Sequence, residues 1–575
     1  MGEGTAPQEL GQRLLADAVP PERPSLLRTF VLLYLPLVAL FVFMGRHTYF
    51  GQPMFEVGDN AANALQIDKA EHLSELLGNY SRFGFHHPGP AFFYVYAAGD
   101  LLFRDLLHVA QAPLNASLLA GLLLQVAFFA LALAILASLV PAHRPTFLLC
   151  ALAIAVVFFH LTDSPEFEVW PPYQLVLPFA CFLSAAIAVA LGRAAVLPIM
   201  VLCGGFLVHG HVAQPLFVVP IFAIAYVSLF AVSRQGPGLG LMRFLSNTAR
   251  PHLWSVIVVF PFVLTLGLDA LRGGQSNLTS ILDNLAHGNP TPSWGRALFY
   301  VLDFLALRGR QAVGVLDVAP ADRLAFLGTY WPALLGWLVV LIVPAIAVLR
   351  SRSSDDRPIV MVHGSAIGGR RFLITYYGLL CVGTLLTLVW AKNQQAELYA
   401  FNSFFFNGLL CVAALPVAFL AARAGVLQSR RARIGVVVVL LLVAVAQPFP
   451  FTGVTTLGGG PGDETGRELN DAAARMASQP GRPSRAILLR FQPDDWPTVV
   501  GLALALERHG ITYLVRPEWG FMFGYDHVYP GSPLVPPSQV PVEWRLAAPS
   551  PTATSQIQLS RGLVVVSVAP AELQP

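Results

Sequence analysis

Long apolar stretches alternate with short polar connectors over most of the chain. Runs such as 118–140 and 334–349 match the roughly 20 apolar residues that an α-helix needs to cross the hydrocarbon core of a bilayer. Shorter apolar stretches at 91–103 and 297–307 are expected to lie at the membrane surface without crossing it. The pattern predicts eleven spans, at roughly 27–45, 115–140, 146–160, 174–192, 194–209, 213–233, 252–270, 328–349, 372–391, 402–422 and 434–448.

Composition agrees with a membrane protein. Hydrophobic residues make up 55% of the chain and charged residues only 12%, whereas a water-soluble domain carries about 25% charged residues. All five cysteines lie inside apolar runs, where a free thiol behaves as a small hydrophobe. The sequence therefore offers no disulfide framework. These cysteines are Cys150, Cys181, Cys203, Cys381 and Cys411.

The distribution of arginine predicts the orientation of the chain in the membrane. The connectors 233–252, 350–371 and 423–433 are rich in arginine, as short cytoplasmic loops are. The connector 161–173 instead holds three acids and no base, so we expect it on the opposite side. With eleven spans, this places the amino terminus in the cytoplasm and the carboxyl terminus outside. We expect a multi-pass protein of a bacterial inner membrane with a periplasmic C-terminal domain.

The polar residues gather in two regions outside the spans. The predicted organisation is a cytoplasmic segment at 1–26, a transmembrane domain at 27–448 with a large external loop at 46–114, and an external domain at 449–575. In that last domain the pattern indicates an α/β fold. Its expected strands are 486–491, 511–515 and 563–568, and its expected helix is 494–509. The predicted fold class is thus a polytopic α-helical membrane protein with external juxtamembrane helices and a small α/β C-terminal domain.

The first loop, 46–114, is longer than a plain connector requires. Its acids Glu56 and Asp59 precede a segment, 62–77, whose apolar residues recur on one face, and this suits a helix lying on the membrane. A turn rich in glycine, proline and aromatic residues follows. It holds the candidate binding residues Tyr80, Arg82, His86 and His87.

The loop between the third and fourth predicted spans has a similar character. Asp163, Glu166 and Glu168 come first, and Trp170 and Tyr173 flank a Pro-Pro pair. The two aromatic rings could stack on a sugar. They could equally belong to the aromatic belt that membrane proteins carry at the lipid interface.

Further candidate binding residues are scattered along the remaining external segments. Ionisable and polar side chains at membrane depth are costly and usually functional, although interfacial histidines with ordinary partners are as frequent. These candidates are His209, His211, Gln214, Asn277 and Lys392.

Taken in order, these features resemble the GT-C superfamily of integral-membrane glycosyltransferases, which includes protein mannosyltransferases and aminoarabinose or arabinofuranose transferases. The resemblance covers roughly residues 27–290. It implies transfer of a sugar from a polyprenyl-phosphate carrier to a glycan, lipid or protein acceptor outside the cytoplasm. It also implies that Asp59 is the general base, with Glu56 as an alternative, and that Asp163 contacts the donor sugar or a metal. Arg82, His86 and His87 are the nearest groups for the departing phosphate.

The resemblance identifies no certain cofactor; a divalent cation, Mg²⁺ or Mn²⁺, would fit the second carboxylate. No nucleic-acid partner is expected. Other interpretations remain open at this point. Gly58-Asp59 before a helix is also an ordinary N-cap. A transporter or flippase would show internal repeats and charges in mid-span, which are scarce here, and an O-antigen ligase or polymerase would concentrate its function in a later loop.

Overall fold

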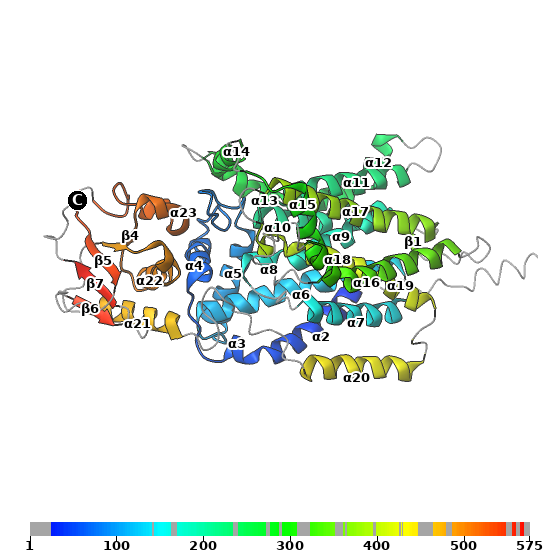
Figure 1. The fold of residues 1–575 in the computed structure, drawn as a ribbon, viewed down its shortest axis with the longest axis horizontal. Helices are drawn as coiled ribbons and strands as arrows, with labels where there is room; N and C mark the ends of the chain where they lie inside the picture. The colour runs from blue at the N-terminus through cyan, green and yellow to red at the C-terminus, as the bar shows by residue number, and fades with distance from the viewer. Residues whose placement is uncertain are drawn as a thin grey trace, which may run out of the picture.

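The structure is a computed structural model with two parts, a long helical bundle and an α/β domain at one end of it (Figure 1). Helix α4 lies between the two parts. The residues that the structure describes are 25–140, 143–162, 169–233, 240–271, 276–286, 290–307, 323–350, 360–362, 365–367, 369–394, 398–424, 427, 429–446, 464–478, 486–536, 538–547, 555–558 and 564–568.

Apolar helices make up the bundle. The described residues contain eight helices that are long and apolar enough to cross a membrane, and two shorter apolar helices. The long ones are α2 (Leu26–Met44), α6 (Pro113–Leu139), α7 (Arg144–Thr162), α8 with α9 (Pro171–Gln174 and Val176–Ala190), α11 (Pro215–Ser233), α13 (Ala249–Leu271), α17 (Gly369–Asn393) and α18 with α19 (Phe405–Ala414 and Pro416–Arg423).

The remaining predicted spans also correspond to helices. These are α10 (Leu197–Gly210), α16 (Arg323–Arg350) and α20 (Arg430–Ala446). Each of the eleven predicted spans therefore has a helix at its position, and the predicted fold class is confirmed. Shorter elements join them: α3 (Arg46–Phe50), α12 (Leu241–Asn247), α14 (Asn277–Ala286), α15 (Trp294–Leu305) and the hairpin of β1 (Val360–Val362) and β2 (Ser365–Ile367).

Helix α9 is the centre of the bundle. Every residue from Val176 to Ala190 is buried, and the helix packs against α6, α10, α11 and α18. A helix that is apolar on all sides is stable only when other helices or lipid surround it. Helix α13 shows the lipid-facing case, because Trp254, Val256 and Phe260 are exposed on its surface. The five cysteines are all free in the structure.

The first loop forms α4 (Gly58–Glu71), α5 (Ala91–Asp100) and a π-helical turn, η1 (Leu101–Leu106). Helix α5 packs against α4, α6 and α10, and it is not among the helices long enough to cross. The expected surface helix at 62–77 is placed differently. It begins at Gly58 and ends at Glu71, and its alanine-rich face packs on the C-terminal domain instead of lying on lipid.

The C-terminal domain is a five-stranded mixed sheet with helices. Strand order is β4-β3-β5-β7-β6, with β3 parallel to β4 and β5, and β7 antiparallel to β5 and β6. The expected strands appear as β3, β4 and β7 and the expected helix as α22, whereas α21, β5 and β6 were not predicted. The bounds are α21 (Glu464–Ser478), β3 (Ile487–Arg490), α22 (Trp496–Arg508), β4 (Tyr513–Leu514), α23 (Gly520–Phe523), β5 (Val542–Ala547), β6 (Ser555–Gln558) and β7 (Val564–Val568).

The first loop completes the core of this domain. Val57, Ala61 and Leu65 belong to the same buried apolar cluster as residues of α21 and α22. The contact is close: a Cβ on Gly466 of α21 would come within 2.6 Å of the Phe55 carbonyl oxygen. A glycine is therefore required there for the chain to pass. The domain and the loop fold against each other as one unit, and this fixes the start of α4 in space.

Candidate active site around Asp59

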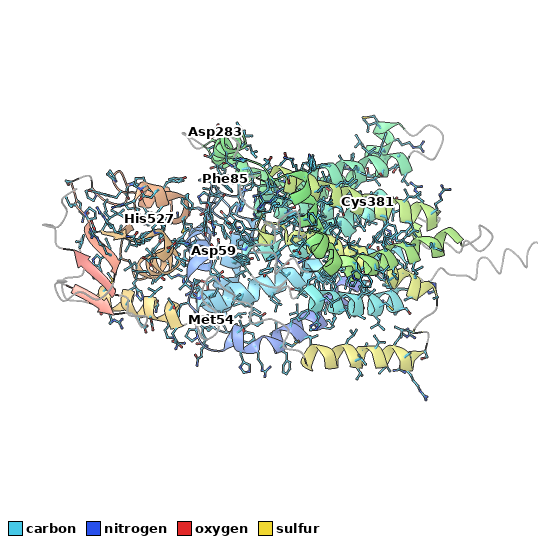
Figure 2. The ribbon with its side chains drawn as sticks, in the orientation of Figure 1. Met54, Asp59, Phe85, Asp283, Cys381 and His527 are labelled. Carbon is cyan, nitrogen blue, oxygen red and sulfur yellow. The ribbon has the colours of Figure 1, made fainter. Side chains whose placement is uncertain are left out.

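Asp59 lies in the first turn of α4, at the boundary between the bundle and the C-terminal domain (Figure 2). Gly58, directly before it, has a φ of 55°, a left-handed conformation that glycine adopts without strain. The N-cap residue is Val57, and the cap position has no side-chain hydrogen bond. Asp59 is thus not the N-cap of α4, and its carboxylate binds elsewhere.

Two neutral donors hold the Asp59 carboxylate. The Tyr80 hydroxyl donates to Oδ1 in a short hydrogen bond. The indole Nε1 of Trp170 donates to Oδ2 over 2.9 Å. Among the described residues, no Lys, Arg or His lies within ion-pair distance of Asp59. A carboxylate has about four lone-pair sites, so each oxygen keeps one for another donor.

Tyr80 connects this carboxylate to the C-terminal domain. Its ring contacts Trp496 of α22 at 6.4 Å between centroids and Phe521 of α23 at 5.9 Å. Burial, together with the adjacent Asp59 carboxylate, raises the pKa of Tyr80 well above its ordinary value. The phenol therefore stays protonated and acts as a hydrogen-bond donor.

Trp170 belongs to a second group of rings on the side of the bundle. Its centroid lies 5.4 Å from Tyr173 and 5.7 Å from Phe401. Tyr173 in turn stacks on Phe404 at 4.7 Å. We call Trp170, Tyr173, Phe401 and Phe404 the inner aromatic row. Trp170 therefore has two kinds of contact. Its ring packs against the other rings of the row, and its N–H donates to Asp59.

The predicted histidines lie next to this site but make internal contacts. His86 Nδ1 lies 3.1 Å from both Gln66 Nε2 and the Gly78 carbonyl oxygen. Asn277 binds the His86 backbone twice, accepting from its N–H at 2.8 Å and donating to its carbonyl at 2.9 Å. Burial lowers the pKa of His86 to about 4. His86 is therefore neutral near pH 7, and Asn277 anchors its backbone to the start of α14.

His87 and His211 face each other, with ring centroids 4.4 Å apart. Burial, and then the proximity of His211, lowers the pKa of His87 well below its ordinary value, and burial lowers that of His211 to about 4. His209 Nε2 lies 3.1 Å from the Phe262 carbonyl oxygen. Gln214 is fully buried. The structure brings these residues together beside the turn that contains His86.

Glu56 has a different environment from Asp59. Arg508 at the end of α22 donates to both its oxygens, at 2.9 and 3.3 Å. The same guanidinium binds Asp68 of α4 at 3.0 and 3.1 Å. Glu56 is buried, so this ion pair joins the first loop to the C-terminal domain. Removing one partner of a buried ion pair is strongly destabilising, so Glu56 and Arg508 hold the first loop and the domain together.

Two of the predicted cations, Arg82 and Lys392, make no ion pair with Asp59 in the part of the chain that the structure describes. Arg82 is exposed, and Lys392 donates to the Thr291 hydroxyl at 2.8 Å while lying over the Trp294 ring. Asp163, Glu166 and Glu168 lie outside the described residues.

In the part of the chain that the structure describes, no group of three His, Cys, Asp or Glu side chains could hold a metal ion. The sequence named no certain cofactor, and Asp163, the carboxylate that a divalent cation would fit, lies outside that part.

Four contributors to the site were not predicted from the sequence. Trp496 and Phe521 come from the C-terminal domain, and Phe401 and Phe404 come from the connector before α18. Aromatic residues near a span end and at a helix start are the available signals. Both are common, so neither distinguishes these rings from others.

The fold and site together define a class: a multi-pass helical membrane protein in which an extramembrane loop and domain hold a carboxylate over the end of the bundle. No protein-family model and no curated protein matches the chain. Among solved structures, the chain is similar to ArnT from Cupriavidus metallidurans bound to undecaprenyl phosphate, with 15% identity, a TM-score of 0.42 and coverage of 93% of this chain and 98% of that one. The apo state of ArnT gives 15% identity, a TM-score of 0.40 and coverage of 92% and 97%.

Proposed function

We propose that the chain is a glycosyltransferase that moves a sugar from a polyprenyl-phosphate carrier to an acceptor hydroxyl, with Asp59 as general base. The carrier is of the same chemical class as the undecaprenyl phosphate bound in one of the ArnT structures. The protein would lie in a bacterial inner membrane, with its amino terminus in the cytoplasm and its C-terminal domain in the periplasm.

One observation carries the proposal. The Asp59 carboxylate is oriented by two neutral donors, Tyr80 and Trp170, and no cation of the described residues neutralises it. A general base needs a fixed direction and a free lone pair. Tyr80 and Trp170 supply the direction, and the remaining lone pairs can accept a proton.

The proposed step is a single displacement. The acceptor oxygen forms a bond to the anomeric carbon while its proton passes to Asp59. The bond between that carbon and the phosphate oxygen breaks, and the carrier phosphate leaves with its electrons. A basic group is expected to stabilise that phosphate. Arg82, an exposed residue two positions after Tyr80 in the first loop, is the candidate.

The test is transfer of radiolabelled sugar in membranes supplied with polyprenyl-phosphate donors. Wild type is compared with Asp59→Asn and with Asp471→Asn, an exposed acid of α21, at matched expression. We expect Asp59→Asn to lose transfer and Asp471→Asn to retain it. Full activity in Asp59→Asn would remove Asp59 from the mechanism. Wild-type membranes that transfer no sugar from any such donor would favour a transporter. Adding EDTA to the same assay tests the metal requirement.

A further inference from the structure

The C-terminal domain presents aromatic side chains beside the Asp59 site. Trp496, Trp519 and Phe521 are partly exposed, and Tyr525 is 60% exposed. These residues belong to α22, α23 and their flanking turns, on the side of the C-terminal domain that faces α4 (Figure 1). Large exposed aromatic groups usually mark an interaction site.

These rings continue directly into the site. Trp519 stacks near Phe521 with centroids 6.3 Å apart and planes 23° apart. Phe521 contacts Tyr80 at 5.9 Å, and Tyr80 donates to Asp59. Trp496 contacts Tyr80 from α22. We call Tyr80, Trp496, Trp519 and Phe521 the outer aromatic row.

Asp59 thus stands between two aromatic rows that differ in origin. The inner aromatic row comes from the ends of bundle helices, where a lipid-linked sugar would arrive. The outer aromatic row comes mainly from the C-terminal domain, where only a group from the aqueous side would arrive. The reaction needs one substrate from each side, because the carrier is held in the bilayer.

The surroundings of the outer aromatic row fit one chemical class of ligand. Arg82, Arg516 and Glu518 are exposed beside its members in the sequence. Tyr525 reaches the turn of the first loop, with its hydroxyl 3.5 Å from the Gly84 carbonyl oxygen. Sugar rings have apolar faces that pack on aromatic rings and hydroxyls that bind charged side chains at the edge. A binding site of this kind combines an aromatic floor with a few polar groups.

We infer that the outer aromatic row is the acceptor site and that the acceptor is a glycan whose sugar rings pack on Trp519 and Phe521. This inference rests on the proposed function for the position of the reacting hydroxyl. The terminal sugar would place that hydroxyl at Asp59, past Tyr80. Its oxygen bonds to the donor's anomeric carbon, its proton passes to Asp59, and the carrier phosphate leaves.

Trp519 provides the sharpest test, because no ring contact joins it to Tyr80 among the described residues. Full-length protein in lipid nanodiscs is titrated with oligosaccharides of about six sugars, built from arabinose, galactose, glucose or mannose, and with peptides of similar length. We expect one of the glycans to bind wild type, and Trp519→Ala to weaken that binding about tenfold, as loss of one ring contact implies. Trp519→Phe should restore most of the affinity. Tyr525→Ala, at a position too exposed to matter for folding, should weaken it severalfold.

Trp544→Phe is the control, since Trp544 is buried in β5 of the same domain and should leave glycan affinity unchanged. Binding of peptides alone, of no glycan probe, or equally of wild type and both alanine variants would overturn the inference. The titration needs no sugar transfer. The protein could bind a glycan through Trp519 and still show no transferase activity. That result would support glycan binding at the outer aromatic row and would reject the proposed function.

Discussion

Glu56 and Asp59 are two carboxylates three residues apart that the fold treats in opposite ways. Glu56 is buried and binds Arg508 through both oxygens. Asp59 is partly buried and binds only the uncharged donors of Tyr80 and Trp170. The chain direction between them changes at Gly58, whose positive φ starts α4.

The difference separates anchoring from chemistry. A carboxylate paired with a guanidinium has its charge neutralised and its lone pairs occupied, so it is a poor proton acceptor. A carboxylate held by neutral donors keeps its charge and part of its hydrogen-bonding capacity. The same short segment therefore fixes the loop through Glu56 and offers a reactive group through Asp59. Substitutions at Asp59, Glu56, Arg508 and Trp170 test that division of roles.

The largest effect is expected for Asp59→Asn. The amide keeps the shape of the side chain but cannot take a proton, so we expect kcat for sugar transfer to fall about a thousandfold. Unfolding behaviour should change little, because the new amide oxygen can still accept from the Trp170 indole and the amide nitrogen can donate to the Tyr80 hydroxyl oxygen. Glu56→Gln in parallel should show the reverse, with weaker docking of the loop and a smaller loss of rate. Equal rate losses in the two variants would contradict the assignment of Asp59 to catalysis and of Glu56 to anchoring.

Next in size is Arg508→Met. The substitution leaves Glu56 and Asp68 without their shared partner, and we expect a local loss of about 2–3 kcal/mol in the interface, below the value for a wholly buried pair because Arg508 is partly exposed. Hydrogen exchange of α4 and α22 amides measures it. The triple variant with Glu56→Gln and Asp68→Asn should recover part of the protection. If Arg508→Met leaves exchange unchanged, the ion pair is not the anchor.

Much of the architecture could be predicted because apolar periodicity is a local property. Eleven runs of apolar residues predicted eleven helices, and each has one at its position. Strands such as 563–568 were recognised from the same kind of pattern. Helix α4 shows the limit. Its small apolar face was expected to lie on lipid, and it packs on α21 and α22, because alanine and glycine do not distinguish a lipid surface from a closely approaching helix.

The site was predicted less completely, because its contacts join distant parts of the chain. Trp170 reaches Asp59 across 111 residues and Arg508 reaches Glu56 across 452. The residue types in the first loop pointed to Asp59 and Tyr80, and the structure brings them together. Nothing in the sequence distinguished Trp170 as a hydrogen-bond donor from an interfacial aromatic residue. The partner of Glu56 could not be inferred, since pairing of one arginine among many depends on tertiary packing.

His86 tests whether the turn beside Asp59 is also a structural element. Burial lowers its pKa to about 4 from an ordinary value of 6.5. Between these values the unfolded chain binds a proton that the folded turn does not, so stability is present above about pH 6.5 and is lost as the pH falls. The expected loss is on the order of 2 kcal/mol by about pH 5. His86→Gln should flatten this dependence of thermal unfolding, whereas His108→Gln, at an exposed position, should not.

The smallest effect is expected for Trp170→Phe, and it is the most informative about the geometry of the carboxylate. Phenylalanine keeps a ring against Tyr173 and Phe401 but removes the N–H that holds Asp59 Oδ2. Loss of one such hydrogen bond amounts to about 1 kcal/mol, or roughly a fivefold lower kcat. Tyr80→Phe should have a similar effect at Oδ1. Because either donor alone still limits rotation of the carboxylate, the double variant should lose more than the product of the two single losses, whereas independent effects would simply multiply. Trp294→Phe, in α15 beneath Lys392, is the matched control, and a Trp170→Phe enzyme as active as that control would show that Asp59 needs no orienting indole.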